Sequence, residues 1–227
     1  NTTHEWIVER TGIHERRIAQ EGETASSLGL EAAKKAIAAA QISKDDIDLI
    51  IVATSTGDYI FPSTACLIQH GLGISKCPAF DVSVACAGFN YALDIADKFI
   101  RAQSAKCALV IGTEIMSKVI DWQDRTTCVL FADGAGAVVL TASTSPGIYS
   151  SHLHADGQYK DLLYTPNGLN PNVKPHLHMS GREVFKIAVQ QLKTLLTEAL
   201  ESNQMEQNAI DWLIPHQANL RIIDLMA

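Results

Sequence analysis

The sequence predicts an α/β fold in which helices cover a mostly parallel sheet. Short apolar runs of the kind found in buried strands alternate with segments of helical periodicity. A helix–loop–strand pattern also occurs twice, with residue 36 aligned to 199 and residue 48 to 211, a constant offset of 163. In addition, a predicted strand gives way to a predicted helix at Cys86, among residues with very small side chains.

The first part of the chain contains the regular alternation. Helical spacing of apolar residues predicts helices at residues 24–41, 63–70 and 87–102. A nearly continuous apolar run predicts a strand covered on both faces at residues 48–53. Residues 78–84 are also predicted as a strand, and residues 106–112 and 135–141 as further buried strands.

The pattern loosens after Pro146. Residues 147–154 are compatible with a strand, and residues 156–175 are a loop rich in Gly, Pro and Asn. Residues 180–202 then carry the clearest apolar stripe of the chain and predict a long helix. Ser180 and Glu183 have the spacing of a capping box at its start.

The internal repeat matches residues 36–51 to residues 199–214 without a gap. Two similar units could arise by chance, and the other interpretation is a duplicated half. On the second interpretation the domains are residues 1–145 and residues 146–227, and the second half is incomplete. We then expect the natural protein to continue past Ala227, and the start at Asn1 rather than Met indicates that it also begins earlier.

Composition narrows the function classes. Of the 227 residues 47% are hydrophobic and 19% are charged, as in ordinary globular proteins. A net charge of −7 argues against general nucleic-acid binding, and the apolar runs are too short to span a membrane. The five cysteines form no CxxC pair, which excludes a familiar zinc pattern and favours reduced thiols in a cytoplasmic protein.

Cys86 is the main candidate for catalysis. A helix begins close to it, and the unpaired N–H groups of a helix start favour a thiolate. Ala85, Ala87 and Gly88 leave space for a substrate. The alternative is a buried structural cysteine, which is the interpretation we prefer for Cys66, Cys77, Cys107 and Cys128.

His216 is the second candidate. It follows an apolar run that predicts a buried strand and precedes a predicted helix, where active sites of α/β proteins are assembled. A neutral imidazole can donate a hydrogen bond to a thioester carbonyl and stabilise an enolate. The alternative is a histidine that caps a helix or packs in the core.

Together these segments resemble the 3-oxoacyl-(acyl carrier protein) synthase III family, thiolase-like condensing enzymes of type II fatty-acid synthesis. The resemblance spans nearly the whole chain. Its most specific segments are Phe-Pro-Ser-Thr-Ala-Cys at 61–66, Ala-Cys-Ala-Gly-Phe at 85–89, Phe-Ala-Asp-Gly-Ala-Gly-Ala at 131–137, Gly-Arg-Glu-Val-Phe-Lys at 181–186 and Pro-His-Gln-Ala-Asn at 215–219. It implies a thiolase-like fold made of two α-β-α layered halves, in agreement with the internal repeat.

The resemblance also implies a mechanism. Cys86 would take a short acyl group, such as acetyl, from coenzyme A, and His216 would promote condensation with decarboxylated malonyl-acyl carrier protein. The family's third catalytic residue, an Asn in a Gly-Asn-Thr-Ser segment, and its Gly-rich oxyanion loop have no match here. A protein of these residues alone is therefore expected to be impaired. No permanent cofactor and no metal are implied.

Binding residues follow from the same resemblance. Trp6 and Arg125 would hold the adenine of coenzyme A, Arg10 would approach its phosphates, and Phe131 would bound the acyl pocket. The remaining coenzyme A positions are Gly181, Phe185, Ala218 and Asn219. Lys186, Arg221 and Arg182 would form a basic patch for the acidic carrier protein. For Trp6 the alternative is an ordinary half-buried aromatic residue, and for the nearby Lys193 it is a solvated helix face.

Two other functions stay open at this point. One is a related acyltransferase of secondary metabolism with the same nucleophile, and the other is a non-catalytic thiolase-like assembly subunit, which would normally lack the cysteine. By analogy with the family we expect a homodimer, with a sheet edge near residues 78–84 and 106–112 at the interface.

Overall fold

The computed structural model describes residues 2–145 and 147–226, which form two compact units. Within these ranges, unit 1 holds residues 2–16, 117–132 and 149–226, and unit 2 holds the rest. The predicted boundary at residue 146 lies outside the described residues. The division into halves 1–145 and 146–227 therefore stays a prediction.

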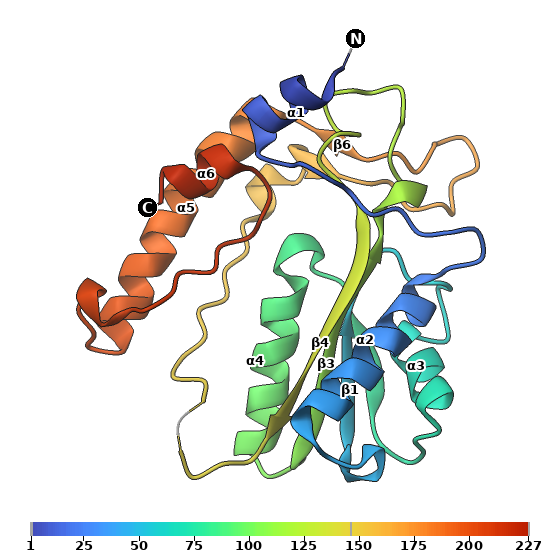
Figure 1. Ribbon diagram of the computed structural model, residues 1–227, viewed down its shortest axis with the longest axis vertical. Coiled ribbons are helices and arrows are strands. Elements are labelled where there is room, and N and C mark those ends of the chain that lie inside the picture. Colours follow the sequence, from blue (N-terminus) through green and yellow to red (C-terminus); the bar gives the residue numbers. More distant parts are fainter. Residues whose placement is uncertain (1, 146, 227) are drawn as a thin grey trace. The chain divides into compact units, whose positions relative to one another are not determined.

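Unit 2 is built on a four-stranded sheet (Figure 1). Its strands are β1 (Leu49–Ala53), β2 (Ala79–Val82), β3 (Cys107–Ile115) and β4 (Asp133–Thr141), in the order β2-β1-β3-β4. β1 pairs in parallel with both β2 and β3, as predicted. β4 is antiparallel to β3. A connection without an α-helix joins these two strands, whereas parallel neighbours usually need a helical crossover.

Helices cover both faces of this sheet (Figure 1). α2 (Ala25–Ala40) and α3 (Thr64–Leu72) pack on one face, and α4 (Gly88–Arg101) packs on the other. β1 is buried along its whole length, with Ile50 and Val52 facing α2 and α3, and Leu49 and Ile51 facing α4. Successive side chains of β1 point to opposite faces of the sheet, and because both faces are covered, all of them are apolar. This confirms the predicted α-β-α layering.

Most predicted helix ends lie within two residues of the observed ones, because local caps fix them. Thr24 and Ser27 form a capping box at the start of α2. α3 continues past Gly71 to Leu72, because the left-handed residue that ends it is Gly73, with φ 66°.

Unit 1 contains three helices and a two-stranded sheet. The helices are α1 (His4–Thr11), α5 (Gly181–Ser202) and α6 (Leu220–Asp224), and the strands are β5 (Leu163–Tyr164) and β6 (His178–Met179). The predicted strand at 147–154 is wrong, since its described residues are irregular backbone. The predicted capping box is also wrong: Ser180, with ψ 75°, makes no side-chain capping bond.

The internal repeat is visible in the backbone. Gln41 and Gln204, which the offset of 163 aligns, both take left-handed φ angles, 55° and 52°. Each follows the end of a long helix, α2 or α5, and each precedes a short 3₁₀ turn, at Lys44–Asp46 or Gln207–Ala209. Helix, left-handed residue and 3₁₀ turn thus recur in the same order and at the same spacing.

The repeat diverges at the next step. β1 follows the first 3₁₀ turn, whereas residues 211–217 are irregular, and Trp212 and Ile214 are 85% and 86% exposed. The prediction of a buried strand before His216 is therefore wrong in the structure. A strand needs a neighbour to bond its backbone groups, and no strand among the described residues pairs with this segment.

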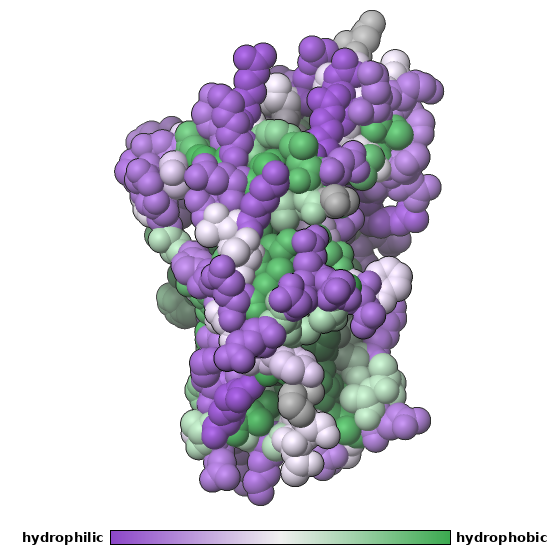
Figure 2. All heavy atoms as spheres, turned by 90° about the vertical axis from the view of Figure 1, so that its left-hand side faces the viewer, coloured by the Kyte–Doolittle hydropathy of each residue, from purple (hydrophilic) through white to green (hydrophobic). Residues whose placement is uncertain are grey.

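The face drawn in Figure 2 shows hydrophobic side chains reaching the surface between hydrophilic ones.

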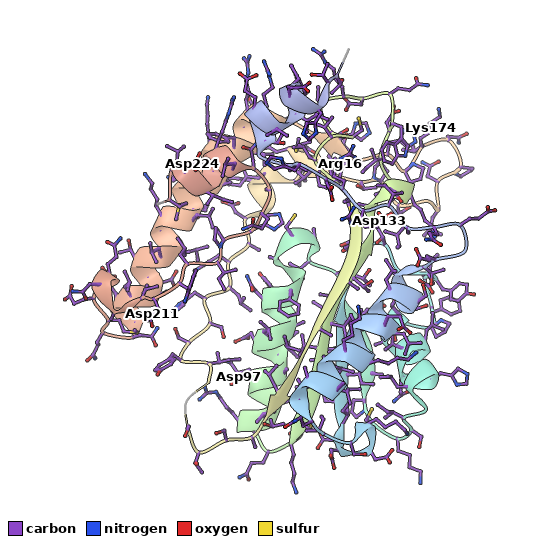
Figure 3. All side chains as sticks on the ribbon, in the orientation of Figure 1. Arg16, Asp97, Asp133, Lys174, Asp211 and Asp224 are labelled. Atoms are coloured by element: carbon purple, nitrogen blue, oxygen red, sulfur yellow. The ribbon has the colours of Figure 1, made fainter. Side chains whose placement is uncertain are left out.

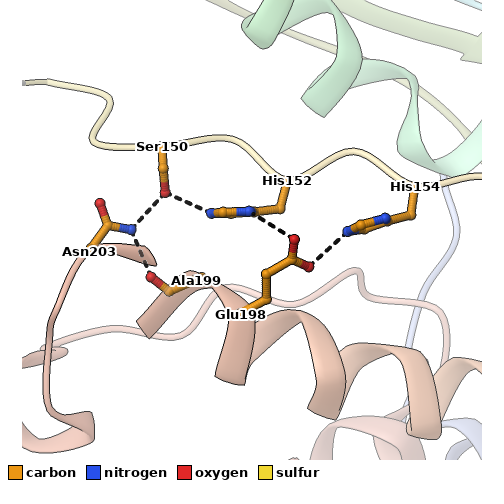
Figure 4. Close-up of polar contacts among 6 residues, drawn as sticks. All are labelled: Ser150, His152, His154, Glu198, Ala199 and Asn203. Carbon is orange, nitrogen blue, oxygen red and sulfur yellow. Dashed lines mark hydrogen bonds and ion pairs between the residues drawn. The ribbon is translucent and has the colours of Figure 1, made fainter. Parts of the chain in front are cut away.

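A polar cluster fastens residues 150–154 to α5 within unit 1 (Figure 4). His152 Nδ1 lies 3.2 Å from one carboxylate oxygen of Glu198, and His154 Nε2 lies 2.7 Å from the other. Ser150 and Asn203 extend the network, with Asn203 Nδ2 donating to Ser150 Oγ at 2.6 Å. The hydrogen bond from His154, followed by its charge and that of His152, holds the pKa of Glu198 below its ordinary value.

Glu198→Gln tests this attachment. A carboxyl with a lowered folded-state pKa stabilises the fold above its unfolded pKa and loses that contribution as the pH falls through the folded value. At neutral pH the variant should unfold at a urea concentration lower by a few tenths of a molar, roughly. Tryptophan fluorescence reports on unit 1, which holds Trp6, Trp122 and Trp212. The difference from the unsubstituted protein should shrink in acid.

The matched control is Glu201→Gln, on the exposed surface of the same helix. It should leave the urea midpoint unchanged. Equal midpoints for both variants at neutral pH would contradict a stabilising role for the Glu198 contacts.

Candidate active site

Cys86 stands between the end of β2 and the start of α4, in unit 2. β2 ends at Val82, a 3₁₀ turn covers Ala85–Ala87, and α4 begins at Gly88. The residue before Cys86 takes a left-handed conformation, with φ 45° at Ala85. Such a conformation is costly for a side chain other than glycine, and it turns the chain sharply at the nucleophile.

Two glycines let the first turn of α4 approach the sheet closely. A Cβ atom on Gly88 would lie 3.1 Å from the Cβ of Ala53, at the end of β1. A Cβ atom on Gly112 of β3 would lie 3.3 Å from Cδ2 of Phe89, in the first turn of α4. Both distances are shorter than ordinary carbon–carbon contacts. Side chains at these positions would push the helix start, and Cys86 with it, away from the sheet.

Cys86 is the exposed cysteine among the five, all of which are described and free. Cys107 is buried, and the other three are half-buried. Cys66 Sγ donates to the carbonyl of Ala79 at 3.6 Å, and Cys77 Sγ accepts from Gln69 Nε2 at 3.2 Å. Exposure thus separates Cys86 from the four cysteines interpreted as packing residues.

The electrostatic expectation for Cys86 is wrong in sign. Although the residue keeps accessible surface, the surrounding protein displaces enough water to raise the pKa of its thiol. Its own backbone N–H lowers the pKa, and the carboxylate of Glu114 raises it further. The 3₁₀ turn at Ala85–Ala87 runs directly into α4, so that Cys86 lies at the start of this helical segment.

His216 lies in unit 1, on the irregular segment before α6. Its residue is exposed, yet the protein around the ring removes enough water to lower its pKa. Because the pKa falls, the neutral imidazole predominates at neutral pH. This is the form that can donate one hydrogen bond without carrying a charge.

Gly12 allows α1 to lie close to α6, the helix that follows His216. It ends α1 with φ 73°, and a Cβ atom there would lie only 2.6 Å from the Cβ of Leu220, the first residue of α6. Asn219 caps α6, its side chain accepting from the N–H of Arg221 at 2.9 Å. α1 and the turn after His216 are therefore held together within unit 1.

Trp6, on α1, has two guanidinium groups near its ring. The Cζ of Arg10 lies 4.6 Å from the ring centroid and the Cζ of Arg125 lies 5.3 Å from it. Both distances are in the range of cation–π attraction. The structure thus brings together the three residues that the sequence predicts around coenzyme A, and Trp6 itself is half-buried.

The other predicted binding residues are also in unit 1. Phe131 is half-buried, and its carbonyl and that of Cys128 accept from Nη1 of Arg16 at 3.4 and 2.5 Å (Figure 3). Gly181 is the first residue of α5, and Phe185 is half-buried one turn later. Ala218 is half-buried just before the α6 cap.

The predicted basic patch lies on exposed helix surface. Arg182 and Lys186 are one turn apart on α5, Lys193 lies two turns beyond Lys186, and Arg221 is on α6. Within the described part of the chain, none of the four has an ion-pair partner. These charges are therefore available to an acidic surface.

The sheet edge differs in part from the expectation for a dimer. β2 is an edge strand, as predicted for residues 78–84. β3 is an internal strand, since β1 and β4 bond to its two sides. Residues 107–112 therefore offer no open edge, and that part of the prediction is wrong.

In the described part of the chain, no group of three or more His, Cys, Asp or Glu side chains could hold a metal ion. Among the described helices, none has the length and hydrophobicity needed to cross a membrane.

Comparison with known proteins gives consistent matches. Residues 80–157 match the family described as 3-Oxoacyl-[acyl-carrier-protein (ACP)] synthase III. The Beta-ketoacyl-[acyl-carrier-protein] synthase III of Methylococcus capsulatus is 54% identical over 226 residues, which are 98% of this chain and 70% of the relative. The crystal structure of 3-oxoacyl-[acyl-carrier-protein] synthase III from Aquifex aeolicus is 48% identical, with a TM-score of 0.94, over 100% of this chain and 71% of that one. The priming beta-ketosynthase of the R1128 polyketide pathway is 38% identical, with a TM-score of 0.94, over 99% and 69%.

Proposed function

The chain belongs to the 3-oxoacyl-(acyl carrier protein) synthase III family, the acyltransferases of the initiating condensation in fatty-acid synthesis, and on this premise we propose that Cys86 carries the acyl group. The observation that supports this best is the exposure of Cys86 at the turn between β2 and α4, whereas the other four cysteines are half-buried or buried. The sharp turn at Ala85 and the close approach of Gly88 leave the sulfur open to a thioester.

The first step is a thioester exchange. The Cys86 sulfur forms a bond to the acyl carbon of the acyl-CoA, the bond from that carbon to the coenzyme A sulfur breaks, and the proton of Cys86 ends on coenzyme A. No oxidant, metal or permanent cofactor enters this balance. We propose acetyl-CoA as the acyl donor.

The second step forms the carbon–carbon bond. Malonyl-acyl carrier protein loses carbon dioxide, and the electron pair of the broken bond becomes an enolate. This enolate attacks the acyl carbon and releases Cys86 as a thiolate. His216 stabilises the enolate oxygen, since burial keeps its imidazole neutral and able to donate one hydrogen bond.

We propose that coenzyme A and the carrier protein bind to two different sets of residues in unit 1. Trp6 offers an aromatic face to the adenine of coenzyme A, and Arg10 and Arg125 offer two cations to the adenine and the phosphates. The further residues proposed to contact the acyl-CoA are Phe131, Gly181, Phe185, Ala218 and Asn219. Lys186, Arg221 and Arg182 offer positive charge to an acidic carrier protein, in a chain whose net charge is −7. We infer that the active protein is a homodimer paired through the β2 edge.

The free state of all five cysteines supports a reducing, cytoplasmic location.

A second candidate function is priming in a polyketide pathway, favoured by the similarity to the R1128 enzyme. Among the solved structures, the higher identity to the 3-oxoacyl-[acyl-carrier-protein] synthase III of Aquifex aeolicus, 48% against 38%, favours the first. The two differ in the carrier protein that accepts the acyl chain, so a comparison of both carrier proteins as substrates distinguishes them.

Cys86→Ser and His216→Ala test the two chemical steps. In a full-length version of the protein supplied with labelled acetyl-CoA and malonyl-acyl carrier protein, Cys86→Ser should form no labelled acetoacetyl product, because the acyl acceptor is lost. His216→Ala should still accept the acetyl group but condense at least about a hundredfold more slowly, since one enolate donor is missing. Cys66→Ser and His70→Ala are the controls and should condense normally. Product formation by Cys86→Ser at the normal rate would overturn the assignment.

Trp6→Ala and Arg125→Ala test the coenzyme A site. Each should raise the Kd for coenzyme A about tenfold, because stacking or cation attraction to the adenine is lost. Trp122→Ala is a matched control, since Trp122 also lies under a guanidinium, with the Cζ of Arg16 at 5.8 Å. Calorimetric titration with coenzyme A measures all three, and an equal loss in Trp122→Ala would count against a specific site at Trp6.

A further inference from the structure

Arg16 is a half-buried cation of unit 1, on the segment that follows α1 (Figure 3). Its Nη1 donates to the carbonyl of Cys128 at 2.5 Å and, at 3.4 Å, to the carbonyl of Phe131. Its Cζ lies 5.8 Å from the ring centroid of Trp122, within the range of cation–π attraction. In the described part of the chain no carboxylate forms an ion pair with Arg16. Two backbone carbonyls and an aromatic ring therefore stabilise this charge.

The carbonyls that Arg16 binds belong to a turn, residues 124–131, whose beginning is held by other contacts. The carboxylate of Asp124 accepts from the N–H of Thr126 at 2.9 Å and from the hydroxyl of Thr127 at 3.0 Å. The backbone carbonyl of Asp124 accepts from the N–H of Thr127. The turn thus has hydrogen bonds of its own at its beginning, whereas Arg16 supplies donors to its end.

The 124–131 turn carries residues proposed for both ends of the acyl-CoA. Arg125, near its beginning, has its Cζ 5.3 Å from the ring centroid of Trp6, where the adenine is proposed to bind. Phe131, at its end, is proposed to bound the acyl pocket. Arg16 binds the main chain at Phe131 itself. Loss of the Arg16 contacts should therefore release Phe131 and leave Arg125 beside Trp6.

We propose that Arg16 is a positioning residue for the acyl pocket: it holds the main chain at Cys128 and Phe131, and so keeps the Phe131 ring in place as a wall that limits the length of the acyl chain. This inference rests on the proposed function, in which Cys86 accepts the acyl group. A pocket can distinguish chains that differ by one methylene group by about tenfold or more, but only if its wall does not yield. A released Phe131 would yield to a longer chain.

Arg16→Met tests this role, because Met keeps the length and the apolar stem of the side chain but has no N–H donor. A full-length version of the protein is given equal amounts of acetyl-CoA and hexanoyl-CoA without malonyl-acyl carrier protein. Peptide mass spectrometry at early times then measures the ratio of acetyl to hexanoyl groups on Cys86. The ratio should fall about tenfold relative to the unsubstituted protein, since a mobile wall excludes the longer chain less well. An unchanged or higher ratio would overturn the proposal.

Two measurements distinguish positioning from a general loss of structure. The Kd for coenzyme A, from calorimetric titration, should change less than about twofold in Arg16→Met, because Trp6 and Arg125 do not depend on Arg16. Arg16→Lys keeps a charged donor that can reach the carbonyls, so its ratio should lie closer to that of the unsubstituted protein. Acyl transfer slowed equally for both chain lengths would mean that Arg16 only stabilises the fold, contrary to the proposal.

A double substitution shows whether Arg16 acts through Phe131. Phe131→Ala should lower the ratio by itself, because the wall is removed. Adding Arg16→Met should then cause no further fall, since no ring is left to position. A further tenfold fall in the double variant would mean that Arg16 acts on another part of the pocket, and the proposal would be wrong.

Arg101→Met is the matched control. Arg101, on α4 in unit 2, also donates to a backbone carbonyl, that of Ile148 at 2.8 Å, so the same kind of contact is lost elsewhere. Its ratio should equal that of the unsubstituted protein. Acyl transfer to Cys86 with an unchanged ratio in Arg16→Met would overturn this inference alone. No acyl group on Cys86 of the unsubstituted protein would overturn the proposed function, and this inference with it.

Discussion

The contact between the first turn of α4 and the ends of β1 and β3 is the constraint on which the candidate nucleophile depends. It is possible because residues 88 and 112 have no side chains, which lets the helix start lie against Ala53 and lets Phe89 lie against β3. The chain reaches this position through the left-handed residue Ala85. As a result Cys86 is carried on a buried scaffold while its own surface stays open.

That scaffold also sets the electrostatics of the sulfur. Within unit 2 the loss of water around Cys86 raises the pKa of its thiol, its own backbone N–H lowers it, and the carboxylate of Glu114 raises it. Loss of water around the ring of His216 lowers the pKa of its imidazole, which is therefore neutral at neutral pH.

The sequence was sufficient where the structure depends on local periodicity. β1 and the helices α2, α4 and α5 were predicted closely, because their apolar spacing reflects the faces they bury, and Cys86 was found from the small residues around a strand–helix turn. Prediction failed where pairing with residues far away in the sequence determines the structure. The run before His216 looks like a strand but has no strand beside it, and the direction of β4 is set by its pairing with β3.

If the fold makes Cys86, among the five thiols, the acyl acceptor, the acyl group must be found on that residue. The protein is incubated with acetyl-CoA in the absence of malonyl-acyl carrier protein, digested in acid to preserve thioesters, and the modified peptide is identified by tandem mass spectrometry. We expect an acetyl group on Cys86 and on none of the other four cysteines, which are half-buried or buried. An acetyl group on Cys66, Cys77, Cys107 or Cys128, or an unmodified Cys86, would contradict it.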